Sequence, residues 1–152
     1  MVRVSIKHGS KYYRNMETKV VFNDTIPFSG FMAMTIWPYI FVRNSAAKRY
    51  NVVASNHEHI HAEQQKEMLL AGIVLAAIGF VFISFWALLF VPVFFWWYGL
   101  EWLWRICQYQ STSKAYRNIC FEREAYAYEK DLDYLRRRKH FAWIAFIIHN
   151  KI

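Results

Sequence analysis

The clearest pattern in the chain is a long apolar run without charge near its middle. No charged side chain occurs from Met68 to Leu100, a stretch of about 33 residues, whereas a helix needs only ~20 apolar residues to cross a bilayer. Pro92 lies inside the run, and proline removes a helical hydrogen bond and clashes with the preceding turn. We therefore expect two spans, 68–90 and 93–108, that form a transmembrane hairpin.

Before this run the pattern changes to one that is typical of strands. Apolar and polar residues alternate over 2–6, and shorter apolar runs follow at 20–22 and 31–42. This pattern predicts a small antiparallel sheet within residues 1–50. Pro38 cannot donate a ladder hydrogen bond, so we expect the last of these strands to lie at an edge of the sheet.

Two further helices are predicted on either side of the apolar run. Ser55 or Asn56 can cap a helix over 56–67, which continues directly into the apolar run. After the run, Asn118 can cap a last helix over 118–139, whose apolar residues fall on one stripe.

Composition and charge support a membrane protein of one domain. The chain has 152 residues, of which 56% are apolar and 20% aromatic, which is more than soluble proteins usually contain. The net charge of +8 is spread over both flanks of the apolar run and is densest at 136–139. Beside a membrane span, this distribution indicates contact with anionic lipid on the cytoplasmic side rather than nucleic acid binding. Both termini are then expected on that side.

The chemistry is concentrated in residues 56–65, which read NHEHIHAEQQ. On a helix, His57 and His61 project from the same face one turn apart, where both can bind one ion, as in the motif H-E-x-x-H. Glu58 stands about 100° around the helix from His57, outside the ligands but beside the open coordination position. It can therefore act as the general base for a water molecule that attacks a carbonyl.

Helical phase also predicts the directions in which the neighbouring side chains point. His59 is expected to point away from the ion and to have no catalytic role. Gln64 and Gln65 come round beneath His61, where they could form hydrogen bonds that support the ligands.

A third protein ligand is needed, because catalytic zinc sites usually have three. The candidates on the last predicted helix are Glu122, Glu124 and Glu129. By helical phase, Glu122 and Glu124 flank the apolar stripe on opposite sides, so geometry alone does not choose between them.

The succession of HEHIH, an apolar hairpin and FEREAYAYEKD resembles the gluzincin metallopeptidases, in particular the membrane-embedded CAAX-prenyl-protease/HtpX-like group. In that group the ligand glutamate lies in E-x-x-A-D. The resemblance implies that Glu122 is the third ligand and Ala125 the small residue, while Tyr126 replaces the usual aspartate. Most of the chain also resembles small membrane proteins of the Bacteroides and Flavobacterium group with HExIHxxQQ and FEREAYAxExD.

The resemblance implies a mainly α membrane protein with a zincin-like helical core, the transmembrane hairpin and the small antiparallel sheet. In it His57, His61 and Glu122 hold Zn²⁺, and Glu58 activates water to hydrolyse a peptide bond. The expected partners are membrane lipid and a peptide or protein substrate, which could pair with the edge strand. The expected location is the bacterial inner membrane, with the site on its cytoplasmic face.

Two alternatives remain open from the sequence. In a non-catalytic protein the zinc would be structural, and His59 or Glu124 could supply a fourth protein ligand. A metal-dependent hydrolase of lipid would keep the same site and differ only in its cleft.

Overall fold

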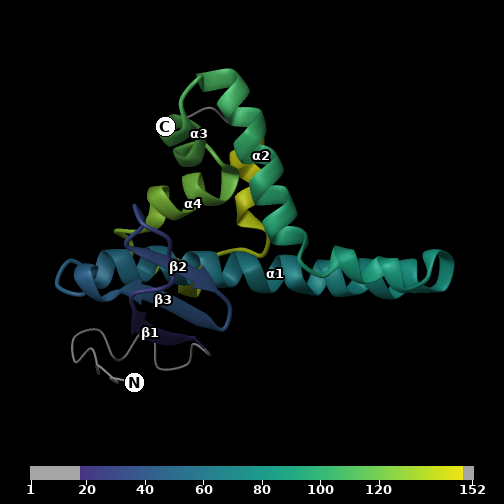
Figure 1. The fold of residues 1–152 in the computed structure, drawn as a ribbon, viewed down its shortest axis with the longest axis horizontal. Coiled ribbons are helices and arrows are strands. Elements are labelled where there is room, and N and C mark those ends of the chain that lie inside the picture. Colours follow the sequence, from purple (N-terminus) through teal and green to yellow (C-terminus); the bar gives the residue numbers. More distant parts are fainter. Residues whose placement is uncertain (1–17, 149–152) are drawn as a thin grey trace. The chain divides into compact units, whose positions relative to one another are not determined.

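The computed structural model describes residues 18–148, which form a mainly helical fold with one small sheet (Figure 1). Two compact units make up these residues, 18–62 with 125–138 and 63–124 with 139–148. The division between the units falls inside two helices, α1 (Val52–Ile83) and α4 (Cys120–Tyr128).

The first unit contains a three-stranded sheet in the order β1–β3–β2. Its strands are β1 (Lys19–Asn23), β2 (Ala33–Ile36) and β3 (Tyr39–Arg43). The strands β2 and β3 are antiparallel, but β1 is parallel to β3, so the prediction of a purely antiparallel sheet is wrong. Ile40 and Val42 of β3 form a buried core cluster with Tyr50. The strand predicted at 2–6 lies outside the described residues.

We expected Pro38 to mark an edge strand, but it does not. It lies in the short turn between β2 and β3, where its missing N–H interrupts no ladder hydrogen bond. Its carbonyl oxygen accepts a hydrogen bond from the backbone N–H of Lys19 at 2.8 Å. The strand after Pro38 is therefore the central one, and β1 and β2 lie at the two edges of the described sheet.

The helix α1 begins earlier than predicted. The side-chain oxygen of Asn51 accepts hydrogen bonds from the backbone N–H groups of Val53 and Ala54, both at 3.0 Å. These bonds satisfy N–H groups that have no partner within the helix. The predicted caps, Ser55 and Asn56, lie inside the helix instead. As expected, the helix continues without a break into the apolar run.

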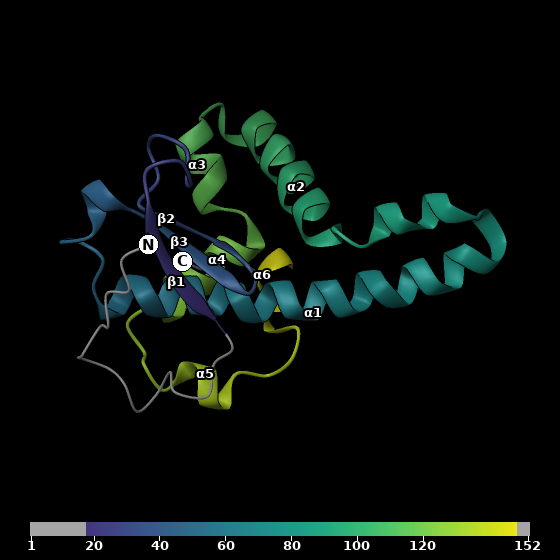
Figure 2. The same cartoon turned by 60° about the horizontal axis from the view of Figure 1, so that its bottom comes forward.

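The apolar run reverses direction at Ser84, where α1 has ended and the backbone φ is +84°. A short 3-10 helix, η2 (Phe85–Phe90), then runs back beside the end of α1 (Figures 1 and 2). Pro92, where we expected the reversal, lies between η2 and α2 (Val93–Tyr109). The start of a helix tolerates proline because its N–H would have no helical partner. The predicted span 68–90 is therefore divided between α1 and η2.

Small residues bring the two legs of this hairpin together. A Cβ atom added at Gly72 would lie 2.4 Å from the carbonyl oxygen of Phe90 and 2.8 Å from that of Val91. One added at Gly79 would lie 3.0 Å from the Cβ atom of Ala87. Such close approach is typical of small residues between packed membrane helices.

Among the described residues, α1 is the one helix long and apolar enough to cross a membrane, over Val52–Phe82. This result depends on length and composition alone, and a core helix of a soluble protein can meet the same criterion. The helix α2, which we expected to be a second span over 93–108, does not meet it. It carries the ion pair between Glu101 and Arg105, with N and O atoms 3.0 Å apart.

The predicted helix over 118–139 is interrupted. Its residues form α4, which ends at Tyr128, and the separate helix α5 after a turn. Asn118, its expected cap, instead follows the end of α3. The remaining short elements are η1 (Asn44–Ala46), α3 (Thr112–Arg117), α5 (Tyr134–Arg137), η3 (Ala142–Ile144) and α6 (Ala145–Ile148).

The core of the second unit joins the apolar run to the C-terminal segment. Met68, Phe94, Phe121 and Trp143 belong to one buried cluster, and the ring centroids of Phe121 and Trp143 are 4.9 Å apart. Trp143 therefore stabilises the interior of this unit.

The hairpin packing can be tested by substituting two glycines. We expect Gly72→Ala to lower the free energy of unfolding by roughly 1–3 kcal/mol, because the new methyl group must displace the backbone of η2. Gly99→Ala is the matched control, since a Cβ atom there meets nothing within 4 Å. It should raise stability by about 0.5–1 kcal/mol, as alanine favours helices over glycine. Denaturant unfolding of the purified proteins in detergent measures both, and equal stability of the two variants would contradict the packing.

Candidate metal centre

The helix α1 brings His57 and His61 together on one face. Their Nε2 atoms are 3.1 Å apart, and only 8% and 7% of the two residues is exposed. Two nitrogen ligands of a tetrahedral zinc ion, each at 2.0–2.1 Å, would be about 3.3 Å apart. The two histidines therefore have the spacing of two ligands of one ion.

Glu129 determines which nitrogen of His57 carries the proton. Its Oε2 atom lies 3.0 Å from Nδ1 of His57, and because a carboxylate oxygen accepts, Nδ1 is the donor. Neutral His57 then presents a lone pair at Nε2, facing Nε2 of His61. A proton or a metal ion between the two nitrogens removes their repulsion. Histidines that bind metals are commonly held by a carboxylate in this way.

Glu58 is held in place by the edge strand β2. The hydroxyl of Thr35 lies 2.7 Å from Oε2 of Glu58 and 3.0 Å from its carbonyl oxygen. Its single proton can bond to either acceptor. Both residues are buried. The carboxylate next to the first histidine therefore has a fixed orientation, set by a residue more than 20 positions earlier in the chain.

His59 turns toward the beginning of its own helix. Its Nδ1 atom lies 2.6 Å from the carbonyl oxygen of Ser55, which can only accept, so Nδ1 donates. This arrangement agrees with the helical phase that separated His59 from His57 and His61.

In the second unit, the two acidic residues at the start of α4 have different partners. Glu122 accepts a hydrogen bond at 2.8 Å from the hydroxyl of Tyr98, and Glu124 accepts one at 3.0 Å from Nε2 of Gln64. The same Gln64 nitrogen donates to the carbonyl oxygen of Phe121 at 3.1 Å. Gln64, which we expected to support His61, thus supports Glu124.

His57, His61 and Glu122 form a group that could hold a metal ion. Each offers one ligand atom, these atoms all lie within 4.8 Å of one another, and all three residues are buried. Within residues 18–148, neither His59 nor Glu124 belongs to such a group. Two imidazoles and a carboxylate suit several first-row metals, zinc among them, and a three-ligand set leaves a coordination position open.

Three residues around this group could not be assigned from the sequence. Thr35 and Tyr98 lie far from it along the chain and belong to no recognisable motif. Glu129 was a candidate ligand and instead binds His57. The ring of Tyr126, which replaces the expected aspartate, packs against His57 with ring centroids 4.8 Å apart.

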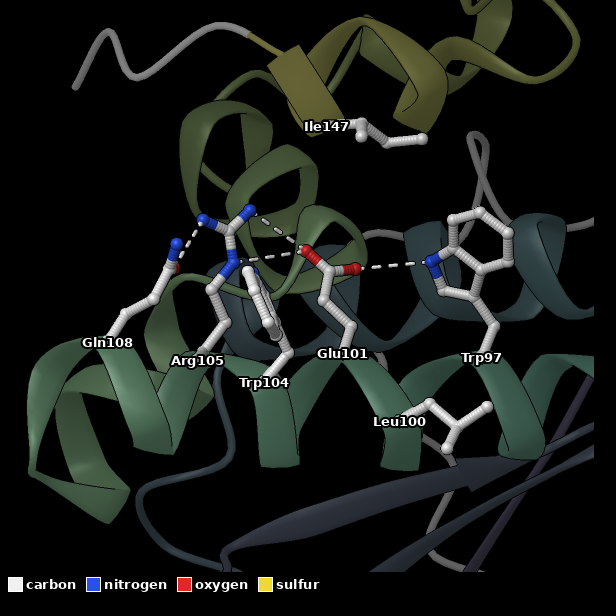
Figure 3. A pocket seen from close by; sticks show the side chains of 7 residues that line it. All are labelled: Trp97, Leu100, Glu101, Trp104, Arg105, Gln108 and Ile147. Carbon is white, nitrogen blue, oxygen red and sulfur yellow. Dashed lines mark hydrogen bonds and ion pairs between the residues drawn. The ribbon is translucent and has the colours of Figure 1, made fainter.

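A second polar cluster lies in a cavity of about 490 Å³ on α2 (Figure 3). Glu101 accepts hydrogen bonds from Nε1 of Trp97 at 3.2 Å, from Arg105 at 3.0 Å and from the backbone N–H of Cys120 at 3.1 Å. Arg105 also donates to Gln108 at 3.3 Å. These bonds tie α2 to the start of α4, so this cluster has a structural role. The residues lining the cavity are Trp97, Leu100, Glu101, Trp104, Arg105, Gln108 and Ile147.

Comparison of the chain with models of known families, with curated proteins and with solved structures gave no match. The likeness to the gluzincins therefore stays a prediction from the motifs. The chemistry of the site must therefore be inferred from its own ligand atoms and the residues around them.

The two histidines are expected to be essential for metal binding. His57→Ala or His61→Ala should abolish it, because no neighbour at the same helical phase can replace the lost nitrogen. His59→Ala is the control and should bind as the unmodified protein does. Metal content after loading and dialysis, measured by mass spectrometry, tests this. Equal loss in all three variants would contradict the assignment.

Glu129 is expected to act through His57 rather than as a ligand. Glu129→Gln should weaken metal binding roughly 10–100-fold without abolishing it, because the amide oxygen can still accept a hydrogen bond from Nδ1–H but carries no charge. Calorimetric titration of the purified protein with Zn²⁺ measures the change. A complete loss of binding would instead make Glu129 a ligand.

Proposed function

We propose that the protein is a small zinc-dependent membrane metallopeptidase of gluzincin type. The observation that carries this proposal is the group of three buried ligand residues, His57, His61 and Glu122, with Glu58 directly after the first ligand. Two imidazoles, one carboxylate and a nearby acid are the parts that metal-assisted peptide hydrolysis requires.

Zinc is the metal that this donor set favours in a hydrolase. Two histidines and one glutamate are the ligands of known catalytic zinc sites, in which the fourth position stays open. A zinc ion bound there would lower the pKa of a water molecule toward 7 and polarise the substrate carbonyl.

Glu58 is the general base in this proposal. It accepts the proton of the attacking water and later gives it to the leaving amine. The hydroxyl of Thr35, 2.7 Å from Oε2, holds the carboxylate in one orientation. Because Thr35 lies on the edge strand β2, a peptide that pairs with this strand would extend past Glu58.

We place the protein in a membrane because of the surface of α1. Large apolar residues are exposed on it, with 64% of Leu70 and 81% of Phe82 accessible, and such patches mark membrane or protein contacts. His61 and Leu70 lie on the same helix, about 14 Å apart along its axis. The basic residues at 136–139 favour the cytoplasmic face of the bacterial inner membrane. The substrate is therefore expected to be a peptide segment close to that surface.

Two substitutions separate the chemistry from metal binding. Glu58→Gln should keep zinc and eliminate hydrolysis, because an amide of the same size cannot take up the proton of water. Glu122→Gln should weaken zinc binding, since a neutral oxygen replaces an anionic ligand. Glu63→Gln, at a partly exposed residue paired with Lys66, is the control and should change neither property.

The assay is a mixed-peptide library in detergent or lipid, analysed by mass spectrometry with and without a chelator. Cleavage by Glu58→Gln as fast as by the unmodified protein would contradict the peptidase. If the zinc-loaded protein cleaved lipid but no peptide, the site would be that of a lipid hydrolase. If it cleaved neither and no exchangeable water were found on the metal, the zinc would be structural.

A further inference from the structure

The exposed apolar part of α1 is too short to cross a bilayer. Glu67 and Met68 are still buried in the protein, with 8% and 5% of each exposed, and the exposed apolar residues begin at Leu70 and continue to Phe82. This part of the helix is about 18 Å long, whereas the hydrocarbon core measures about 30 Å. Apolar stretches of about 10–14 residues are typical of re-entrant segments rather than of spans.

The return leg of the hairpin, from Ser84 through η2, reaches back over a similar length of α1. The chain leaves α1 at Ser84 and is level with Gly72 again at Phe90 and Val91, where the backbone carbonyls lie against that glycine. From Gly72 to Ser84 the helix rises about 18 Å, which is close to the ~15 Å of hydrocarbon in one leaflet. Figure 2 shows both legs of this hairpin and the reversal between them.

Both legs present apolar side chains to their surroundings. No charged residue occurs from Met68 to Leu100. More than half of the surface of each of the following residues is exposed: Ile78, Val81 and Phe82 on α1, and Phe85, Trp86 and Leu88 on η2. Acyl chains around the hairpin would match this surface. In water the same apolar surface would be exposed at a free-energy cost.

The backbone of the return leg is also suited to hydrocarbon, where unsatisfied polar groups are costly. The N–H groups of Ala87 and Val91 donate to carbonyl oxygens within η2 and its cap, both at 3.1 Å. The indole N–H of Trp96 donates to the carbonyl oxygen of Leu89 at 3.0 Å. These hydrogen bonds, two within the return leg and one from α2, satisfy polar groups that lipid could not.

We propose that residues 70–90 enter a single leaflet as a re-entrant hairpin, with Ser84 near the bilayer mid-plane, and that the chain does not cross the membrane there. The partner of this surface is the acyl-chain layer of one monolayer. The inference rests on the membrane location in the proposed function, and not on the peptidase chemistry. It replaces the two crossing spans that the sequence suggested.

The test measures the depth of the hairpin tip in the full-length protein. Cys107, which is exposed, is replaced by serine, while Cys120 stays because burial raises the pKa of its thiol and keeps it unreactive. Ser84→Cys then carries a spin label, and Ser113→Cys, at an exposed position of α3, is the matched control. Both proteins are reconstituted into phosphatidylethanolamine–phosphatidylglycerol vesicles with a nickel relaxation agent on both sides. An unchanged far-UV circular dichroism spectrum and unchanged elution in detergent show that a variant has folded, and Phe85→Cys replaces Ser84→Cys if that variant has not.

The label at residue 84 is expected about 15 Å below the surface, accessible to oxygen but not to the nickel complex, while the label at residue 113 is fully accessible to nickel. An impermeant maleimide should react with unlabelled Ser84→Cys only after detergent is added. High nickel accessibility at residue 84 would overturn the proposal, whether the tip has crossed the membrane or has not inserted. Vesicle flotation and peptide hydrolysis in detergent are measured separately, so that loss of membrane binding or of the peptidase is distinguished from an error in depth.

Discussion

The facing Nε2 atoms of His57 and His61 are the constraint on which the rest of the site depends. Two buried imidazole nitrogens 3.1 Å apart repel each other if both present lone pairs. Glu129 accepts a hydrogen bond from the Nδ1–H group of His57, so the lone pair of this ring, at Nε2, must point at Nε2 of His61. The helix fixes the spacing of the two residues, and Glu129 with the ring of Tyr126 fixes the direction of His57. This spacing and this ring direction together allow one cation to bind between the two nitrogens.

The same helix meets two environments that its sequence period does not reveal. Residues Ser55 to Ala62 are all buried, so this part of α1 is covered on every side, and polar groups there must find partners within the protein. From Leu70 onward most side chains are exposed and apolar. Neither part has the single apolar stripe of a surface helix. The change occurs within about two turns, without a break in the helix.

Local geometry explains which features could be predicted from the sequence. A spacing of four residues fixes the two histidines once a helix is assumed, and helical phase separates Glu58 and His59 from them. The choice of Glu122 over Glu124 depends on long-range packing, which no local pattern specifies, and Thr35 reaches the site through a strand pairing. The reversal at Ser84 was missed because Pro92 is the stronger local signal, although proline is equally suited to the start of a helix.

Three consecutive ionisable residues are buried on α4, which is unfavourable unless each has a compensating partner. Glu122, Arg123 and Glu124 are 2%, 1% and 0% exposed, and consecutive residues stand about 100° apart, so the helix is enclosed on every side. Gln64 donates to Glu124, Arg123 donates to a backbone carbonyl oxygen at 2.6 Å, and Tyr98 donates to Glu122. Replacing buried charges by apolar residues of similar volume is often neutral or stabilising, so stability alone does not require an anion at position 122. A carboxylate there is favourable where a bound cation supplies the opposite charge, and metal binding then contributes to the free energy of folding.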